Sequence, residues 1–301
     1  MIAVGGDSGT GKATLARGLE IIFGDARSVR IALDDYRSLD RAQRKAVGLT
    51  ALDPRANNFA AMQEDLWALR EGRAIEKPTY DHVAGTFGPI ERIEPKEIVI
   101  VHGLFPLYTR ALRSLFDVTI WNDPEPELRT AWEIRRDTLQ RGYTVEGVRA
   151  LRQSREPNVA KYISPQARYA DLTVRFNRPS DWDAADPDRL SASIRKGGRF
   201  RPLDYHEFES ASISISQSQS AAGGHPETVI EIDGHIAPAD AVHVQDSIWS
   251  HLNLQGARPA RAGEFGDAQG KEAISPTLAL VELLIARRVV LIEEELAEMV
   301  S

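Results

Sequence analysis

A glycine-rich segment directly after a short apolar run constrains the fold of this chain more than any other feature. Residues 2–4 are apolar, and the letters GGDSGTGKAT follow at residues 5–14. The spacing from Gly6 to Lys12 is that of a P-loop, whose glycines let several backbone N–H groups point into one concavity that suits phosphate oxygens. A helix beginning near Lys12 adds the positive end of its dipole, and the ammonium group can reach the outer phosphates of a nucleotide. The segment therefore predicts a nucleotide-phosphate site between a strand and a helix.

One position in this loop departs from the motif. Ala13 stands where a serine or threonine usually helps to hold Mg²⁺, and the hydroxyl comes one residue later, at Thr14. A glycine-rich turn without a ligand is the alternative interpretation. The apolar run before the loop, the lysine in register and the amphipathic pattern of residues 15–23 favour phosphate binding.

Apolar runs of strand length alternate with helical patterns through the first 180 residues. This alternation predicts an α/β fold, a mainly parallel sheet with helices on both faces and ligands at the carboxyl ends of its strands. We expect strands at residues 2–4, 28–33, 97–101, 117–121 and 171–176. We expect helices at residues 13–23, 41–47, 59–71, 104–115, 126–141 and 145–155.

A polar, proline-bounded segment at residues 179–187 suggests a boundary. We therefore expect a P-loop core at 1–180 and a C-terminal α+β extension packed on it at 181–301. The extension is expected to contain a strand at 228–232 and helices at 238–252 and 275–300. The serine-rich residues 210–220 fit a flexible loop and an exposed edge strand equally well.

Composition excludes several classes of function. The net charge of −7 argues against a general nucleic-acid binder, because no basic excess exists to release counterions from a phosphate backbone. The absence of cysteine excludes disulfides, thiol catalysis and thiolate zinc sites. Glu282, Arg287 and Arg288 interrupt the apolar residues 278–292, which predicts a buried amphipathic helix and not a membrane span. We expect a cytoplasmic protein that binds neither nucleic acid nor membrane.

A pair of carboxylates follows the second expected strand. Asp34 and Asp35 come at the end of the apolar residues 28–33. A carboxylate at that end of the strand beside the P-loop strand can accept the proton of an attacking hydroxyl or help to hold a metal ion. Arg41 and Lys45 follow four residues apart, which places both cations on one helix face. The alternative for the two acids is a helix N-cap with first-turn carboxylates.

Two further segments carry polar side chains that suit such a site. Tyr80 and His82 lie in an expected loop and can bind a hydroxyl or a phosphate, although either one alone is more often structural. The helix expected at 126–141 carries four charged residues on one face, at spacings of three, four and eight: Glu133, Arg136, Asp137 and Arg141. The alternative for that face is a solvated surface whose ion pairs each contribute about 0.3–0.5 kcal/mol.

These segments together resemble the phosphoribulokinase family, within the group of P-loop kinases that includes uridine kinase. The resemblance is carried by GGDSGTGKATLARGL, LDDYRSLDRAQRKAVGLTALDPRANNF, EKPTYDHVAGTFGPIERIEP, IVHGLFPLY and WEIRRDTLQRGYTVEGVRALRQSREPNVAKYISPQARYADLTVRF. These stretches cover most of residues 2–176, and a weaker likeness continues through EIDGHIAPADAVHVQDSIWSHL to SPTLALVELLIARR. Ordered matches of this length are far more specific than a P-loop alone.

The resemblance implies a three-layer P-loop kinase that uses ATP and Mg²⁺ to convert ribulose 5-phosphate to the 1,5-bisphosphate, a carbon-fixation step of the Calvin cycle. It implies catalytic roles for Lys12, Asp34 as the base, and Asp137, with Asp34 and Asp137 at the metal. It implies that ATP is bound by Gly6, Asp7, Ser8, Gly9, Thr10, Gly11, Lys12, Ala13 and Thr14. It places the sugar phosphate among Arg37, Arg41, Lys45, Tyr80, His82, Arg136, Arg141 and Arg155. We expect the chain to form a homodimer or a higher homo-oligomer.

Five positions depart from the family pattern, and we expect all five to face one cleft: Ala13, Arg37, His102, Phe105 and Glu133. Ala13 and His102 replace a hydroxyl and a carboxylate, which weakens a site for Mg²⁺, an ion that prefers oxygen ligands. Arg37 and Phe105 replace histidines. Glu133 replaces a lysine and so reverses a charge beside the phosphoryl group.

The departures leave two alternatives open. One is a kinase for a different small hydroxyl substrate, because the acceptor side is reshaped. The other is a catalytically degenerate member that binds nucleotide without turnover. Thr10 and Ala32 stand where the redox-regulated members carry cysteines, so thiol switching of that kind is excluded.

Overall fold

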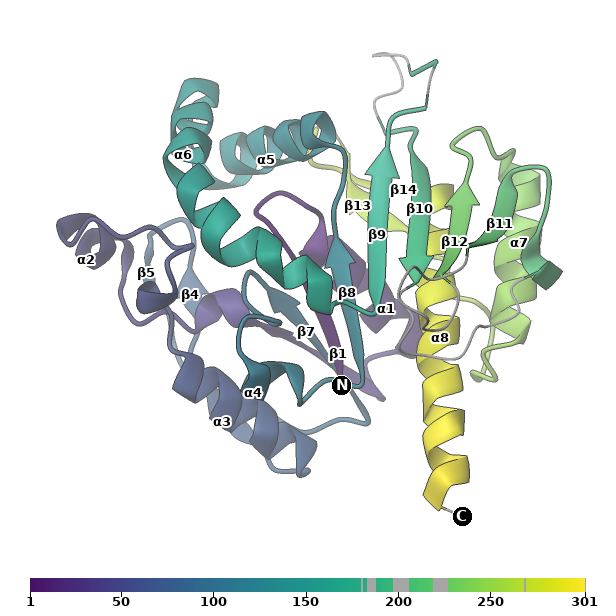
Figure 1. The fold of residues 1–301 in the computed structure, drawn as a ribbon, viewed down its shortest axis with the longest axis horizontal. Coiled ribbons are helices and arrows are strands. Elements are labelled where there is room, and N and C mark those ends of the chain that lie inside the picture. The colour runs from purple at the N-terminus through teal and green to yellow at the C-terminus, as the bar shows by residue number, and fades with distance from the viewer. Residues whose placement is uncertain (180, 183–187, 197–205, 219–226, 268, 301) are drawn as a thin grey trace. The chain divides into compact units, whose positions relative to one another are not determined.

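The computed structural model describes residues 1–179, 181–182, 188–196, 206–218, 227–267 and 269–300 (Figure 1). The chain forms two compact units. Unit 1 comprises residues 1–13, 26–122 and 129–170, and unit 2 comprises residues 14–25, 123–128 and the chain from 171 onward. Candidate site residues 6–13, 34–82 and 136–155 therefore belong to unit 1.

Unit 1 is built on parallel strands in the order β8, β1, β7, β2. They comprise β1 (Ile2–Gly6), β2 (Ser28–Ala32), β7 (Ile98–Gly103) and β8 (Val118–Asn122). All five residues of β1 are buried, as expected for a central parallel strand that is covered on both faces. β1 and β7 are paired with Val4 opposite His102, so the P-loop and the residues after β7 leave the sheet at the same edge.

The helices of unit 1 are α2 (Arg41–Ala46), α3 (Phe59–Arg70), α4 (Arg110–Arg113), α5 (Pro126–Arg141), which enters from unit 2, and α6 (Val145–Asn158). Side-chain caps mark the N-termini of α2, α3, α4 and α6. Asp40 forms a capping box with Gln43, and Asn58 and Thr144 cap α3 and α6. Helices α3 and α4 bury apolar side chains against β7 in one core cluster, which includes Met62, Leu66, Val99, Val101 and Leu112 (Figure 1).

Short elements complete unit 1. Two hairpin-like pairs form from β3 (Ile75–Lys77) with β6 (Glu91–Ile93), and β4 (Tyr80–Asp81) with β5 (Thr86–Phe87). Helical turns occur at Leu33–Asp35, Pro54–Ala56, Val159–Ile163 and Ser164–Tyr169. The sequence pattern did not predict the two strand pairs, because their segments are too short to show a period.

The helix expected at residues 104–115 is wrong in extent, since only α4 (Arg110–Arg113) is helical there. Pro106 disfavours helical backbone at the residue before it, and Thr109 caps α4. Gln166 satisfies backbone groups on both sides of Pro106: its side chain accepts from Leu107 N at 3.1 Å and donates to Leu104 O at 2.9 Å.

Unit 2 contains most of α1 (Lys12–Phe23) and an antiparallel set of strands in the order β11, β12, β10, β9. The strands are β9 (Leu172–Asn177), β10 (Ser191–Lys196), β11 (Ile213–Ser218) and β12 (Glu227–Ile232). β11 lies within the serine-rich residues 210–220 and is an edge strand, which favours the strand interpretation of that segment. Residues 219–220 lie outside the described residues. Unit 2 also contains α7 (Pro238–Ser250), α8 (Pro276–Val300), β13 (Glu264–Gly266), β14 (Glu272–Ile274) and a turn at His206–Phe208.

Helix α8 is more buried than the amphipathic pattern suggested. Glu282 and Arg288 are both 0% exposed, among apolar neighbours along the helix. Glu282 accepts a hydrogen bond from Gly263 N at 2.7 Å. Among the described residues, no helix is long and apolar enough to cross a membrane.

The expected fold class is confirmed. A mostly parallel central sheet is flanked by helices, and additional strands follow in the C-terminal part of the chain.

Candidate functional site

The loop between β1 and α1 has the backbone geometry of a phosphate cradle. Gly6, Gly9 and Gly11 have φ angles of 151°, 76° and 82°, a region in which residues with a side chain are strained. The Thr10 hydroxyl donates to Asp7 O at 2.9 Å and closes the loop. Positive φ angles at these glycines are typical of loops whose backbone N–H groups turn toward one concavity, so the loop backbone is suited to binding an anion.

Lys12 is folded over this loop. Its ammonium donates to Asp7 O at 2.5 Å, and the side chain is almost fully buried. Burial lowers the pKa of Lys12, although Asp34 and Asp7 oppose that shift. The ammonium thus lies at the loop, in position to exchange a carbonyl partner for a phosphate oxygen.

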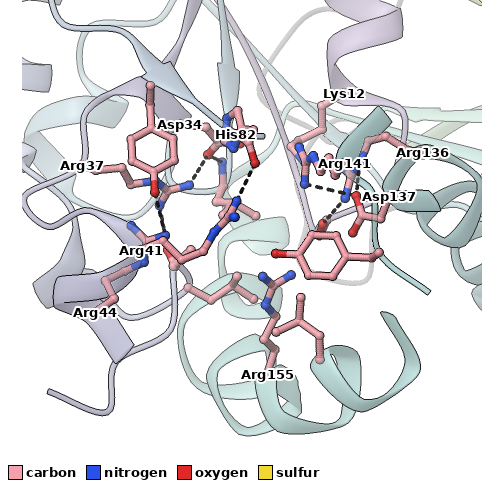
Figure 2. Close-up of a pocket in the computed structure, with 17 residues that line it drawn as sticks. Lys12, Asp34, Arg37, Arg41, Arg44, His82, Arg136, Asp137, Arg141 and Arg155 are labelled. Carbon is pink, nitrogen blue, oxygen red and sulfur yellow. Dashed lines mark hydrogen bonds and ion pairs between the residues drawn. The ribbon is translucent and has the colours of Figure 1, made fainter. Parts of the chain in front are cut away.

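The pocket beside the P-loop is strongly cationic. It contains about 670 Å³ of space outside the protein atoms, part of it open to solvent, and Ser8 and Lys12 lie at its P-loop side. Seven cations line it: Lys12, Arg37, Arg41, Arg44, Arg136, Arg141 and Arg155. Asp34 and Asp137 are its two carboxylates (Figure 2). An excess of guanidinium groups in a concave site favours a ligand with more than one phosphate.

Asp34 enters the pocket from the turn that follows β2. Leu104 N donates to Asp34 Oδ1 at 3.4 Å, and Arg37 Nη2 lies 3.4 Å from the same oxygen. Burial opposes ionisation, but the charges of Arg37 and Lys12 outweigh it and lower the pKa of Asp34 to about 2. Asp34 is therefore an ionised carboxylate in a cationic pocket.

The two acids after β2 have different roles. Asp35 accepts from Lys77 Nζ at 2.5 Å and from Tyr80 N at 3.1 Å, so it holds the segment of β3 and β4. The N-cap of α2 is Asp40, so neither acid of the pair caps that helix.

Helix α2 places a different cation in the pocket from the one expected. Lys45 is exposed and is absent from the pocket lining, so the structure does not bring it together with the other residues expected at the sugar phosphate. Arg44, one residue earlier and therefore about 100° around the helix, lines the pocket and donates to Tyr80 Oη at 3.1 Å. The spacing of four residues from Arg41 suggested Lys45, but the spacing of three selects Arg44.

Tyr80, His82 and Arg41 lie together along the loop that closes one side of the pocket. The Tyr80 hydroxyl donates to Gly85 O at 2.7 Å, and Arg41 donates to His82 O at 2.5 Å and to Val83 O at 3.1 Å. Burial lowers the pKa of His82. The structure thus brings these three candidates to the pocket, with Tyr80 and Arg41 also ordering its wall.

Arg37 is deeply buried beside Asp34. It donates to Ala51 O at 2.8 Å and to Asn57 Oδ1 at 2.5 Å, which fixes its guanidinium plane. Its position in the pocket fits the expected place on the acceptor side.

Asp137 lies between two arginines on the other side of the pocket (Figure 2). Both arginines contact the same carboxylate oxygen: Arg136 Nε lies 2.7 Å and Arg141 Nη1 lies 3.2 Å from Asp137 Oδ1. The carboxylate orients both guanidiniums toward the pocket that they line.

The substituted positions do not all face the pocket. Phe105 packs on Phe59 and Tyr108 in the apolar core, so the expectation that it faces the cleft is wrong. His102 is partly buried near the end of β7, and desolvation lowers its pKa to about 4 despite the charge of Asp34. Ala13 is exposed and offers no ligand atom.

Sequence reasoning missed Arg44, Tyr143 and Leu151, which also line the pocket. The period of α2 could have indicated Arg44. No signal in the sequence pointed to Tyr143 or Leu151, because they follow a helix end and lie in an exposed-looking helix.

Comparisons with known proteins find relatives of this chain. Residues 1–182 match the sequence model of the phosphoribulokinase/uridine kinase family. A phosphoribulokinase of Synechocystis is 45% identical over 175 residues, which span 58% of this chain and 53% of the relative. A chloroplastic phosphoribulokinase of Triticum aestivum is 41% identical over 292 residues, which span 85% of this chain and 72% of the relative.

A solved structure supports the fold. The phosphoribulokinase from Rhodobacter spheroides superposes with a TM-score of 0.59 and 20% identity, over 81% of this chain and 93% of that chain. The sequence alignments with the curated relatives span from about half to about three quarters of the relatives' own length.

Proposed function

The chain belongs to the phosphoribulokinase/uridine kinase family, and we propose that it transfers the γ-phosphoryl group of ATP to ribulose 5-phosphate. The observation that supports this most is the joint presence of a P-loop and an ionised carboxylate in one arginine-rich pocket. The P-loop suits the donor, and the arginines suit an acceptor that already carries a phosphate.

Residues at the two sides of the pocket divide the chemistry. Lys12 and the P-loop amides hold the donor phosphates, where the ammonium neutralises charge that develops on the transferred group. Asp34 orients the acceptor hydroxyl and accepts its proton as the new O–P bond forms and the bond to the leaving β-phosphate oxygen breaks. With a pKa of about 2, Asp34 is a weak base, which suits a loose transition state in which the proton leaves late.

Arginines supply the acceptor's phosphate site in this proposal. Arg37 and Arg155 line the pocket together with Arg41 and Arg44. Guanidinium groups bind phosphate oxygens through paired N–H donors, and such binding fixes the distance between the sugar's hydroxyl and the donor. Positioning of this kind accounts for much of the rate in phosphoryl transfer.

The metal site fits Mg²⁺ bound mainly through nucleotide phosphates. The described residues contain no cluster of three side chains that would hold a metal by themselves. Mg²⁺ commonly uses one or two carboxylates with substrate phosphates and waters, which Asp34 and Asp137 can provide. A bound ion would neutralise part of the negative charge of the phosphates.

A second candidate is nucleotide binding without turnover. Ala13 offers no hydroxyl and His102 no carboxylate, and both arginine neighbours of Asp137 compete with a metal for its oxygens. The third candidate is a kinase for another small substrate with a hydroxyl group, because Arg37 and Glu133 differ from the family pattern on the side of the pocket that would bind the acceptor.

An assay that couples ADP release to NADH oxidation separates these candidates. The wild-type chain is given ATP and Mg²⁺ with a panel of pentose phosphates and nucleosides. We expect turnover with ribulose 5-phosphate above all other acceptors. Turnover with another acceptor alone would replace the proposed substrate, and ATP binding without any transfer, also with Mn²⁺, would favour the nucleotide-binding alternative.

We also propose that the chain is a homodimer or a higher homo-oligomer in solution. Sedimentation velocity at several protein concentrations tests this directly. A single species at the mass of one 33.3 kDa chain would contradict it.

A further inference from the structure

Helix α5 supports the P-loop along one face. Arg129, Glu133 and Arg136 follow at spacings of four and three, so they lie on the same side of the helix. Arg129 Nη1 lies 2.8 Å from Asp7 Oδ2, and Arg136 Nη2 donates to Ser8 Oγ at 3.0 Å. Two consecutive residues of the loop are therefore held by two residues of α5.

Glu133 lies directly against the next glycine of the loop. A Cβ atom placed on Gly9 would be 2.7 Å from Glu133 Cβ and 3.0 Å from Arg129 O. The helix and the loop thus approach as closely as a glycine allows. A side chain at position 9 would therefore collide with α5.

The Glu133 carboxylate is turned away from the loop into a cluster of guanidiniums. It is 2% exposed, and its Oε2 accepts from Arg152 Nη1 at 2.5 Å. Its Oε1 lies 3.7 Å from Arg136 Nη2 and 3.8 Å from Arg155 Nη1. One buried carboxylate therefore compensates three arginines from α5 and α6.

The three arginines are not equivalent. Arg136 and Arg155 line the pocket, whereas Arg152 does not. Arg152 makes the shortest contact with the Glu133 carboxylate, at 2.5 Å. The two pocket arginines, Arg136 and Arg155, lie farther from it, at 3.7 and 3.8 Å. Arg155 Nε has no hydrogen-bond partner, and burial lowers the pKa of Arg155 while Glu133 opposes that shift. Arg155 is therefore held near the carboxylate while retaining donors for a ligand.

We propose that Glu133 is a positioning residue for the acceptor's phosphate group. Paired with Arg152, it holds Arg136 and Arg155 near the same carboxylate oxygen, against their mutual repulsion, at the edge of the pocket that both line. The charge at position 133, which the sequence suggested would oppose a phosphoryl group, is neutralised by this cluster. The inference rests on the proposed kinase function and adds a determinant of how its acceptor binds.

Two physical effects of removing the charge have opposite signs. If Glu133 only lowered the positive potential of the pocket, Glu133→Gln would tighten binding of a phosphate. If Glu133 positions the arginines, the same change lets three guanidiniums repel one another, and phosphate binding weakens. A charge-assisted contact is commonly worth about tenfold in affinity, so the two effects are separable.

Isothermal titration calorimetry measures the outcome without requiring turnover. Ribulose 5-phosphate and ATP are titrated separately into the wild type, Glu133→Gln, Arg152→Gln and the double variant. We expect acceptor affinity to fall about tenfold in Glu133→Gln, with ATP affinity within about twofold of the wild type. Arg152→Gln should also weaken the acceptor, because Glu133 then draws Arg155 toward itself.

The double variant and a matched control complete the test. In the double variant the fold-loss of acceptor affinity should be smaller than the product of the fold-losses in the two single variants, since the pair acts as one unit. Glu146→Gln, which removes an exposed carboxylate of α6, should leave both affinities unchanged. Unchanged or tighter acceptor binding in Glu133→Gln, or equal losses for acceptor and ATP, would overturn the proposal.

The remaining outcomes are also decisive. If the wild type binds no ribulose 5-phosphate, the proposed substrate fails, and inorganic phosphate as the titrant tests Glu133 with the same expected direction. If Glu133→Gln does not fold by circular dichroism, Arg152→Gln carries the test, since it leaves Glu133 with two arginine partners. Wild-type affinity in Arg152→Gln would then overturn the positioning role.

Discussion

At the scale of single residues, Asp34 is the group on which turnover depends in our proposal. It is an ionised carboxylate under the charges of Arg37 and Lys12, in the lining of a pocket with seven cations. A carboxylate in that place accepts a proton chiefly as the transition state forms. Its removal should therefore affect the catalytic step more than substrate binding.

Asp34→Asn tests this role. We expect kcat to fall by about 10² or more, with a smaller change in KM, because the interaction is made mainly in the transition state. Steady-state kinetics with ribulose 5-phosphate and ATP measures both constants. The control is Asp25→Asn, which removes an exposed carboxylate and should leave kcat unchanged. Turnover of Asp34→Asn near that of the wild type would transfer the role to another group.

The lowered pKa of Asp34 also predicts an acid-sensitive contribution to stability. Its pKa is about 2 in the folded chain against an ordinary value of 3.8. The ionised group therefore stabilises the fold above about pH 4, and this contribution is lost as the pH falls toward about 2. Urea unfolding at pH 7 and pH 3 should show a smaller acid-induced loss in Asp34→Asn than in the wild type. An equal loss in both chains would contradict the assigned pKa.

At the scale of elements, the P-loop and its neighbours were predictable because local chemistry determines them. Glycine spacing, a lysine in register and an amphipathic helix suffice for the loop from Gly6 to Lys12. The helix expected at 104–115 failed because Gln166, far along the chain, satisfies backbone groups around Pro106 that a helix would otherwise pair. Lys45 lies outside the pocket lining for a related reason: helical spacing restricts the candidates, but packing decides which cation faces the pocket.

The contact between the P-loop and α5 predicts a specific effect of Gly9→Ala. The new methyl group would lie 2.7 Å from Glu133 Cβ, so the loop must move away from α5. We expect ATP affinity to fall at least about tenfold by calorimetry, because a displaced loop loses aligned N–H donors. Gly24→Ala is the matched control, since Gly24 has a similar φ of 79° and nothing within 4 Å of the added atom.

The control separates backbone strain from the clash. Both substitutions place a side chain at positive φ, which costs on the order of 1 kcal/mol of stability. Only Gly9→Ala should lose nucleotide affinity. Equal ATP affinities in the two variants would show that the loop tolerates displacement from α5.

At the scale of the whole molecule, the sequence predicted the α/β class, whereas the interleaving of the two compact units along the chain had no signal in it. The alternation of strands and helices continues through residue 176 without a signal that α1 belongs with the C-terminal strands. Strand β10 was missed because its serines and basic residues hide the period of two, whereas the more apolar β12 was found. Burial of charged residues in α8 was likewise invisible, because a sequence shows that a charge is present and not whether its surroundings are dry.

Glu282 in α8 connects the stability of unit 2 to pH. The side chain is fully buried, and burial raises its pKa well above the ordinary value of 4.5. A raised folded-state pKa means that stability is greatest while the group is protonated and falls as the pH rises through the interval between the two values. Within that interval each pH unit costs up to about 1.4 kcal/mol.

Glu282→Gln should therefore be more favourable at high pH than at low pH. The amide keeps an oxygen that can accept from Gly263 N but carries no charge to bury. We expect the free energy of unfolding of Glu282→Gln, relative to the wild type, to rise by at least about 1 kcal/mol from pH 5 to pH 8. Urea unfolding followed by circular dichroism measures the difference.

Because a chain with two compact units can unfold in two steps, the shift should occur in the transition that includes α8. Glu294→Gln, at an exposed position of the same helix, should show no such pH dependence, and a constant difference for Glu282→Gln would mean that Glu282 is ionised in the folded chain.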